Sequence, residues 1–263
     1  MRIGVFDSGL GGLSVLRAIR ERLPQASLAY VADSAWVPYG GRSDDFIRHR
    51  SLVLARFLVE HGADMIVVAC NTATAAAVPA LRESLRVPVV GMEPAVKPAT
   101  QATRNGVVGV LATVGTLQSA RFAALLDRFG EGVQVLTRAC PGLVERIEAG
   151  DLDGPQTRAL VTRYVRPLVD GGADTLVLGC THFPFVRRLI EAEAGANVAI
   201  IDTGDAVARQ VERVAGTAGL CLLRGEVGDA FWTSGDARQQ APVFEKLWGQ
   251  RLSVADLPTE VAV

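Results

Sequence analysis

The sequence predicts an α/β protein made of two similar parallel-sheet domains. Short apolar runs alternate with segments of helical period, which is typical of a parallel sheet covered by helices on both faces. Helices are expected to begin at Ser43, which two acids follow, and near Pro155. The expected strands are Ile3–Phe6, Leu28–Val31, Met65–Ala69, Val87–Val90, Val107–Leu111, Thr175–Leu178 and Val198–Ile201.

An internal repeat indicates that the fold occurs twice. The segment LVEHGADMIVVAC at 58–70 returns at 168–180 as LVDGGADTLVLGC, with seven of thirteen positions identical. Each copy contains the end of a helix, a Gly-Ala-Asp turn, an apolar strand and a cysteine at the carboxyl end of that strand. A weaker echo relates residues 4–8 to 109–113. Each half would therefore start with an equivalent strand.

We expect the two domains to be discontinuous and related by a pseudo-two-fold axis. The first would comprise residues 1–94 and 208–263 and the second residues 95–207, with crossings near 91–94 and 202–204. In open parallel sheets the ligand lies beyond the carboxyl ends of the strands. Cys70 and Cys180 are therefore expected to face one active-site cleft from opposite sides.

Composition excludes several classes of protein. The chain has 263 residues, is 49% hydrophobic, and balances 27 Lys and Arg against 28 Asp and Glu, so no footprint for nucleic acid is evident. Its start lacks the pattern of an export signal, and no apolar stretch approaches the ~20 residues that span a bilayer. We expect a cytoplasmic protein that does not enter membranes. The four cysteines lack the paired spacing of a zinc site.

The repeated thiols are the best candidates for chemistry. A single cysteine at the end of an apolar strand is usually a small buried hydrophobe, and Cys140 and Cys221 keep that interpretation. Two at equivalent positions, Cys70 and Cys180, favour a function instead. A thiol has an ordinary pKa of ~8.5, so a small shift gives either protonation state. One thiolate could remove a proton from carbon while the opposite thiol returns one.

Polar turns follow both of these strands. Asp7 follows the first strand and His182 lies two residues beyond Cys180, so each half offers an acid or base that could assist its thiol. The turn at 7–12, DSGLGG, lacks the third spaced glycine of a dinucleotide loop and the lysine of a P-loop. Its N–H groups and the Ser8 hydroxyl could instead bind a substrate carboxylate. A purely steric need for glycine would explain the glycines but not Asp7 and Ser8.

At this point the chain resembles the glutamate racemases. The motifs DSG at 7–9 with GG at 11–12, VPYG at 37–40, ACNT at 69–72 and GCTHFP at 179–184 occur in the order and at about the spacing of that family. Ala112 and Thr113, Glu148, and TSGD at 233–236 also look like it. The resemblance covers nearly the whole chain. Trp36 departs from it, because related sequences often carry a smaller or basic residue there.

The resemblance implies a two-base racemisation of glutamate. Cys180 would take the α proton from L-glutamate and Cys70 from D-glutamate. Asp7 would assist Cys70, and His182 would assist Cys180 with Glu148 as a further acid nearby. The residues implied to contact or position glutamate are Asp7, Ser8, Tyr39, Gly40, Asn71, Thr72, Thr113, Thr181 and His182.

The resemblance also implies the setting of the reaction. It implies no pyridoxal phosphate, no other cofactor and no metal. The product would be D-glutamate, destined for peptidoglycan and the cell wall. Some members of the family need a peptidoglycan precursor as activator, and that property cannot be carried over from the sequence alone. The oligomeric state is left open, a homodimer included.

Three other functions stay open at this stage. A sibling enzyme of the same architecture could act on aspartate, a hydantoin or maleate and keep both cysteines. A Cys–His hydrolase would need one essential thiol with a base and an oxyanion hole, which leaves the second repeated cysteine unused. A regulatory role through binding another protein would leave no trace in the sequence.

Overall fold

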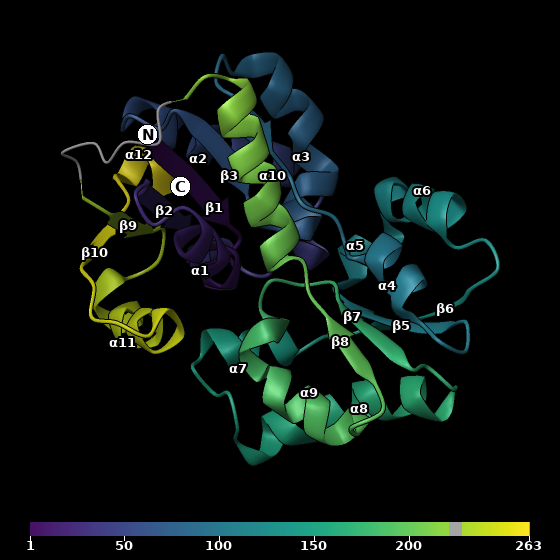
Figure 1. Ribbon diagram of the computed structural model, residues 1–263. Helices are drawn as coiled ribbons and strands as arrows, with labels where there is room; N and C mark the ends of the chain where they lie inside the picture. Colours follow the sequence, from purple (N-terminus) through teal and green to yellow (C-terminus); the bar gives the residue numbers. More distant parts are fainter. Residues whose placement is uncertain (221–227, 263) are drawn as a thin grey trace. The chain divides into compact units, whose positions relative to one another are not determined.

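The computed structural model describes residues 1–220 and 228–262, which form two compact α/β units (Figure 1). The first unit consists of Met1–Met92 and Gly204–Val263, and the second of Glu93–Thr203. The domain boundaries expected from the sequence stay a prediction. Cys221 lies outside the described residues. Within the described ranges, no helix has both the length and the apolar character needed to cross a bilayer.

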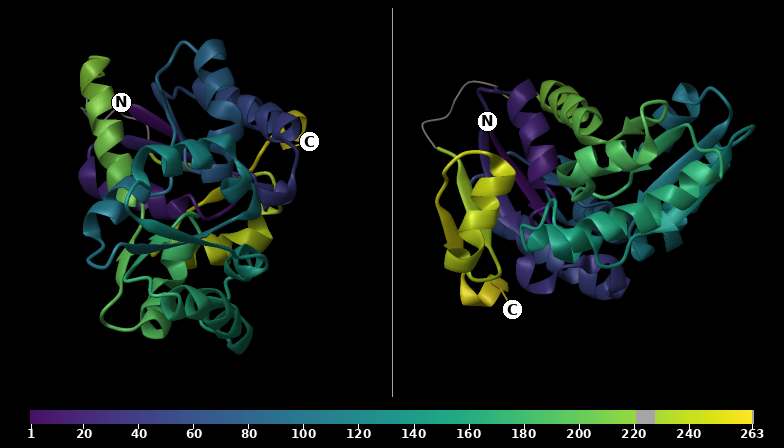
Figure 2. Two further views of the ribbon diagram at one scale, coloured as in Figure 1. Left: turned by 90° about the vertical axis from the view of Figure 1, so that its right-hand side faces the viewer. Right: turned by 90° about the horizontal axis from the view of Figure 1, so that it is seen from below.

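The first unit contains a six-stranded sheet in the order β10-β9-β2-β1-β3-β4, with all neighbours parallel. Figure 2 shows the C-terminal strands, in yellow, close to the N-terminal ones, in purple, because β9 pairs with β2. The ends of the chain are therefore joined in one sheet. Its strands are β1 (Arg2–Asp7), β2 (Ser27–Ala32), β3 (Met65–Val68), β4 (Val89–Val90), β9 (Ala230–Thr233) and β10 (Val254–Asp256).

Helices cover both faces of this sheet. On one face α1 (Leu13–Arg22) packs against α10 (Gly204–Thr217) and α11 (Ala237–Trp248), and on the other α2 (Asp44–Glu60) packs against α3 (Asn71–Ser84). The short α12 (Thr259–Ala262) contacts α2. As predicted, α2 begins after Ser43, whose hydroxyl accepts from the Phe46 N–H at 3.3 Å.

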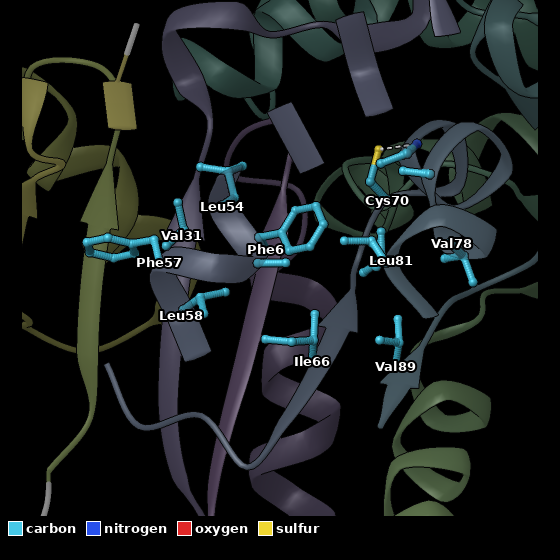
Figure 3. Packing of buried hydrophobic residues seen from close by; sticks show 14 of the residues in the cluster. Phe6, Val31, Leu54, Phe57, Leu58, Ile66, Cys70, Val78, Leu81 and Val89 are labelled. Carbon is cyan, nitrogen blue, oxygen red and sulfur yellow. Dashed lines mark hydrogen bonds between the residues drawn. The ribbon is translucent and has the colours of Figure 1, made fainter. Parts of the chain in front are cut away.

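The core beneath α2 is formed by the strands of the sheet and the apolar stripe of this helix. Figure 3 shows Leu54 and Leu58 of α2 packed with Phe6 and Ile66 of β1 and β3. Cys70 belongs to the same cluster, at the carboxyl end of β3. The burial that holds the helix on the sheet therefore also fixes the position of this thiol.

The second unit contains a four-stranded parallel sheet in the order β6-β5-β7-β8. Figure 1 shows α4 and α6 on one face and α8 and α9 on the other. As predicted, α8 begins at Pro155. The elements are α4 (Val96–Ala102), β5 (Val107–Ala112), α5 (Val114–Gln118), α6 (Ala120–Phe129), β6 (Gln134–Ala139), α7 (Leu143–Glu148), α8 (Pro155–Asp170), β7 (Thr175–Leu178), the 3₁₀ turn η3 (Phe183–Val186), α9 (Arg187–Ala194) and β8 (Ala199–Ile201).

The duplication predicted from the sequence is visible in the sheets. The order β2-β1-β3-β4 in the first unit matches β6-β5-β7-β8 in the second. Even single hydrogen bonds recur, since the Asp33 N–H donates to the Asp7 carbonyl at 3.0 Å and the Cys140 N–H donates to the Ala112 carbonyl at 3.0 Å. The two cysteines of the repeat therefore occupy equivalent positions, just after β3 and just after β7.

Three strands were not predicted. The side chains of β6 are exposed or half-buried, so its sequence lacks the apolar run that marks a covered strand. The other two, β9 and β10, have four and three residues and extend the first sheet beyond the duplicated part. The two units therefore share a four-stranded core, and the first has an addition at one edge.

Candidate active site

Cys70 lies where β3 ends and α3 begins. It is the N-cap of α3, and its sulfur accepts from the Ala73 N–H at 3.5 Å, the contact dashed in Figure 3. The side chain is 6% exposed, and its Sγ is 3.8 Å from the Ser8 hydroxyl. A helix N-terminus stabilises negative charge, so this is a favourable place for a thiolate. Asn71 and Thr72, both predicted site residues, form the first turn of α3 and are buried.

Asp7 organises the turn after β1. One carboxylate oxygen accepts from the Ser8 N–H at 2.7 Å and from its hydroxyl at 3.3 Å, and the other accepts from the Gly12 N–H at 2.6 Å. Two N–H groups of the turn that the sequence suggested for a substrate carboxylate therefore donate to Asp7. A Cβ at Gly12 would stand 2.8 Å from both the Asp7 Cβ and the Tyr30 hydroxyl, so glycine is sterically required there.

Tyr39 lies in the 3₁₀ turn η2 (Tyr39–Gly41), which follows η1 (Ser34–Trp36) and packs against α3. Its side chain is 1% exposed, and its hydroxyl donates to Asp33. Burial and then the charge and hydrogen bond of Asp33 raise the pKa of this phenol well above 10, so it keeps its proton. Gly40, also predicted, is half-buried in the same turn.

Sequence analysis missed the ion pair behind this tyrosine. The Arg50 guanidinium donates to both oxygens of Asp33, at 3.0 Å from Nε and 2.7 Å from Nη2, and the two side chains are 1% and 0% exposed. The signal was present, since Arg50 follows Ile47 by three residues and precedes Leu54 by four. An arginine at that spacing interrupts the apolar stripe of α2.

Cys180 has a different partner from its counterpart. Its sulfur is 3.6 Å from Nδ1 of His182, and Nε2 of the same ring is 2.5 Å from the Glu148 carboxylate, which comes from the last residue of α7. Burial disfavours the imidazolium, but the hydrogen bonds and charges of Cys180 and Glu148 outweigh it and raise the pKa of His182 well above 6.5. The sequence placed His182 beside Cys180, and the resemblance implied that Glu148 is nearby; in the structure the three groups form one chain of contacts.

The remaining residues predicted in the second half also gather at the carboxyl edge of its sheet. Thr181 is buried directly after Cys180. Thr113 follows β5, and its hydroxyl accepts from the Thr116 N–H at 3.3 Å and so caps α5. Cys140, interpreted as structural, also lies at this edge, where burial and then the charge of Cys180 raise the pKa of its thiol. No group of three His, Cys, Asp or Glu residues that could hold a metal ion occurs in the part of the chain described.

The predicted site residues thus form two sets, one at the carboxyl edge of each sheet. The sequence profile of the Asp/Glu/Hydantoin racemase family matches residues 3–211. The chain belongs to the Asp/Glu/hydantoin racemase family. It is therefore an amino-acid racemase, an enzyme of the isomerase class. Within this family the chain is similar to proteins named glutamate racemase. One from Pseudomonas paraeruginosa is 59% identical over 256 residues, which is 97% of each chain.

Solved racemases of this family have the same fold. The crystal structure of a glutamate racemase isoform from Bacillus anthracis matches with a TM-score of 0.87 and 33% identity, over 98% of this chain and 97% of the other. That of Escherichia coli glutamate racemase, in complex with L-glutamate and the activator UDP-MurNAc-ala, matches with a TM-score of 0.86 and 34% identity over 97% of each chain.

Proposed function

We propose that the protein is a glutamate racemase that interconverts L- and D-glutamate without a cofactor, with Cys70 and Cys180 as its two acid/base groups. The observation that carries this proposal is the equivalence of the two thiols at the ends of β3 and β7 in a duplicated fold. Relatives named glutamate racemase, aligned over 97% of the chain, support the choice of substrate.

The proposed reaction moves one proton off the α carbon and another onto it. The Cys180 thiolate removes the α proton of L-glutamate, and the Cys70 thiol then protonates the opposite face of the carbanion to give D-glutamate. The reverse reaction exchanges the roles. The two thiols have different helpers: the first unit offers the α3 N-terminus and Asp7, and the second offers His182 with Glu148. For this chemistry the two carboxyl edges must face one cleft, which is part of the proposal.

The basic test is racemisation in a buffer that contains chelator and no cofactor. L-glutamate is added to the purified protein and optical rotation is followed. Aspartate and a hydantoin are offered as alternative substrates in separate assays of the same kind, and maleate, which is achiral, in an assay that follows its isomerisation by NMR. We expect the rotation of glutamate to decay to zero. A requirement for pyridoxal phosphate or a metal, or a preference for one of the competitors, would replace this proposal with the corresponding alternative.

Serine substitutions test the two-base mechanism. A serine keeps the shape of the side chain but is far too weak an acid to supply a comparable base near neutral pH. In deuterated water, Cys180→Ser should lose exchange into L-glutamate and keep exchange of the α proton of D-glutamate. Cys70→Ser should do the reverse. Both variants should racemise glutamate at a small fraction of the parent rate. Circular dichroism measures the racemisation, and NMR measures the exchange of the α proton.

Cys140→Ser is the matched control, because Cys140 is equally buried and lies at the same sheet edge as Cys180. Its Sγ contacts the Arg138 carbonyl at 3.4 Å, a contact that serine can also make, so the parent rate is expected. Near-parent racemisation by either of the other two variants would rule out that cysteine as a base. If both lose racemisation with swapped exchange preferences, the mechanism holds and only the assignment of faces changes.

The cellular role that we propose is the supply of D-glutamate for peptidoglycan in the cytoplasm. Depleting the protein in its host should then cause loss of cell shape and lysis, and D-glutamate in the medium should rescue growth where the cells take it up. Rescue by D-glutamate and not by L-glutamate is the decisive result.

A further inference from the structure

Asp33, Tyr39 and Arg50 form a closed polar network inside the first unit. Asp33 accepts from the Tyr39 hydroxyl and, through both of its oxygens, from the Arg50 guanidinium. All three side chains are at most 1% exposed. The Trp36 ring covers the guanidinium, whose central carbon is 5.8 Å from the ring centroid. Both carboxylate oxygens of Asp33 therefore accept hydrogen bonds from groups of the protein itself.

Stability alone does not account for such a network. Removing two charges from water costs several kcal/mol per ion, and apolar residues of the same volume often stabilise a protein as well or better. Arg50 occupies a position on the buried stripe of α2 where an apolar side chain would pack against the sheet. Its planar, bidentate hydrogen bonding fixes direction more than it adds stability.

The network lies beside the candidate active site. Asp33 follows β2 directly, and its N–H donates to the carbonyl of Asp7 at 3.0 Å. Tyr39 and Cys70 belong to the same buried cluster, and the turn that carries Tyr39 packs against α3, whose N-cap is Cys70. The duplicated position in the second unit holds Cys140, so the carboxylate is a feature of the first unit only. Asp33 thus connects the strand edge that bears Asp7 with the turn that bears Tyr39 and Gly40.

We propose that Asp33 and Arg50 are positioning residues for substrate binding, which act by holding the Tyr39 hydroxyl and thereby the Tyr39–Gly41 turn in its binding conformation. This inference rests on the proposed function, which places Tyr39 and Gly40 at glutamate. Because the hydroxyl donates its proton to Asp33, that proton is not available to the substrate. Since the Tyr39 ring is also buried, the part of the turn left to contact the substrate is its main chain around Gly40.

The test is a double-mutant cycle on KM and kcat with the full-length enzyme. Tyr39→Phe removes only the hydroxyl, and Asp33→Asn removes the charge that holds it. Each should raise KM for glutamate about tenfold, the factor expected from one charge-assisted hydrogen bond, and lower kcat less than threefold because both thiols remain. The double variant should be no worse than the worse single one, because Asp33 acts through the hydroxyl.

Two further variants separate positioning from folding. Leu54→Val removes a methylene from a fully buried side chain of α2, one turn beyond Arg50, and serves as the control for lost stability, with KM within twofold of the parent. Arg50→Lys keeps the charge without the planar fork and should retain more affinity than Arg50→Met. Thermal unfolding is recorded for each variant.

If Asp33→Asn does not fold, the whole network is replaced in the triple variant Asp33→Leu/Tyr39→Phe/Arg50→Met, which removes its three polar side chains together. It should fold with a raised KM. Parental KM in the triple variant or in both single variants, or additive effects in the cycle, would overturn the inference. The proposed function fails separately, if the parent protein does not racemise glutamate at all.

Discussion

The contacts of His182 with Cys180 and Glu148 make one contribution to the stability of the folded protein depend on pH. The pKa of this imidazole is raised in the folded protein, despite burial, by Cys180 and Glu148. In the unfolded chain it returns to about 6.5. Folding therefore binds this proton more tightly, and the stabilisation is present in full below about pH 6.5 and is lost as pH rises through the folded pKa.

His182→Gln should remove this dependence. We expect the free energy of unfolding of the parent to fall more steeply than that of the variant as pH rises from 6.5 towards 10, measured by urea denaturation. The control is His49→Gln, an exposed substitution on α2, which should follow the parent curve. Parallel curves for the parent and His182→Gln would contradict the assigned direction of the shift.

Those residues of the candidate site that come shortly after a strand could be predicted from the sequence. Cys70 and Cys180 are marked by the repeat, and Asp7 and His182 by their distance along the chain from the strand ends. Asp33 and Arg50 could not be paired from the sequence, because a buried ion pair across 17 positions leaves no periodic signal. Nor could the sequence show that Asp7 accepts from two N–H groups of its own turn, those of Ser8 and Gly12.

At the scale of elements, each unit contains a strand glycine against which a helix packs closely. A Cβ added at Gly4 of β1 would stand 2.8 Å from the Ala63 Cβ and 3.1 Å from the Leu58 Cβ. A Cβ added at Gly109 of β5 would stand 2.5 Å from a methyl group of Leu176 and 3.2 Å from the Leu168 Cβ. Leu58 and Leu168 are equivalent positions of the repeat. The weaker echo around these glycines thus has a steric cause.

Gly4→Ala and Gly109→Ala should each destabilise the protein by about 1–3 kcal/mol, because an extra methyl group in a packed interface displaces its neighbours. Gly216→Ala is the control. That glycine lies exposed in α10, a Cβ there would meet no atom within 4 Å, and alanine should be neutral or stabilising. Chemical denaturation measures all three. No loss of stability in either strand variant would show that the helix can move away at little cost.

Strands were predicted best where both faces of the strand are buried. The strands β1, β2, β3, β5 and β7 are mostly buried and apolar, so their sequences are distinctive. By contrast, β6 is largely exposed, and β10 has three residues at the edge of its sheet. Where packing does not demand apolar side chains, the local sequence carries little information on the strand.

At the scale of the whole molecule, the chain uses one skeleton twice with different chemistry. The strand ends that bear Asp7 and Asp33 in the first unit bear Ala112 and Cys140 in the second. The acidic side chains of the candidate site stand at strand ends in the first unit. In the second unit the acidic side chain is Glu148, at the end of α7. The repeat predicted the shared skeleton, but not where each half would place its acid.

Equivalent strand ends of the two units thus carry different residues, but this asymmetry cannot alter the equilibrium between two enantiomers. L- and D-glutamate have the same free energy in water, so under the proposed function the equilibrium constant is one. The equilibrium constant equals kcat/KM for L-glutamate divided by kcat/KM for D-glutamate. These two values of kcat/KM must therefore be equal. A substitution confined to one unit, Asp33→Asn for example, can shift KM for the two enantiomers by different factors. The ratio of the two kcat values must then change by the same factor as the ratio of the two KM values, so that progress curves started from either enantiomer still give equal kcat/KM. The asymmetry of the protein can decide how tightly each enantiomer is bound, but never which enantiomer predominates at equilibrium.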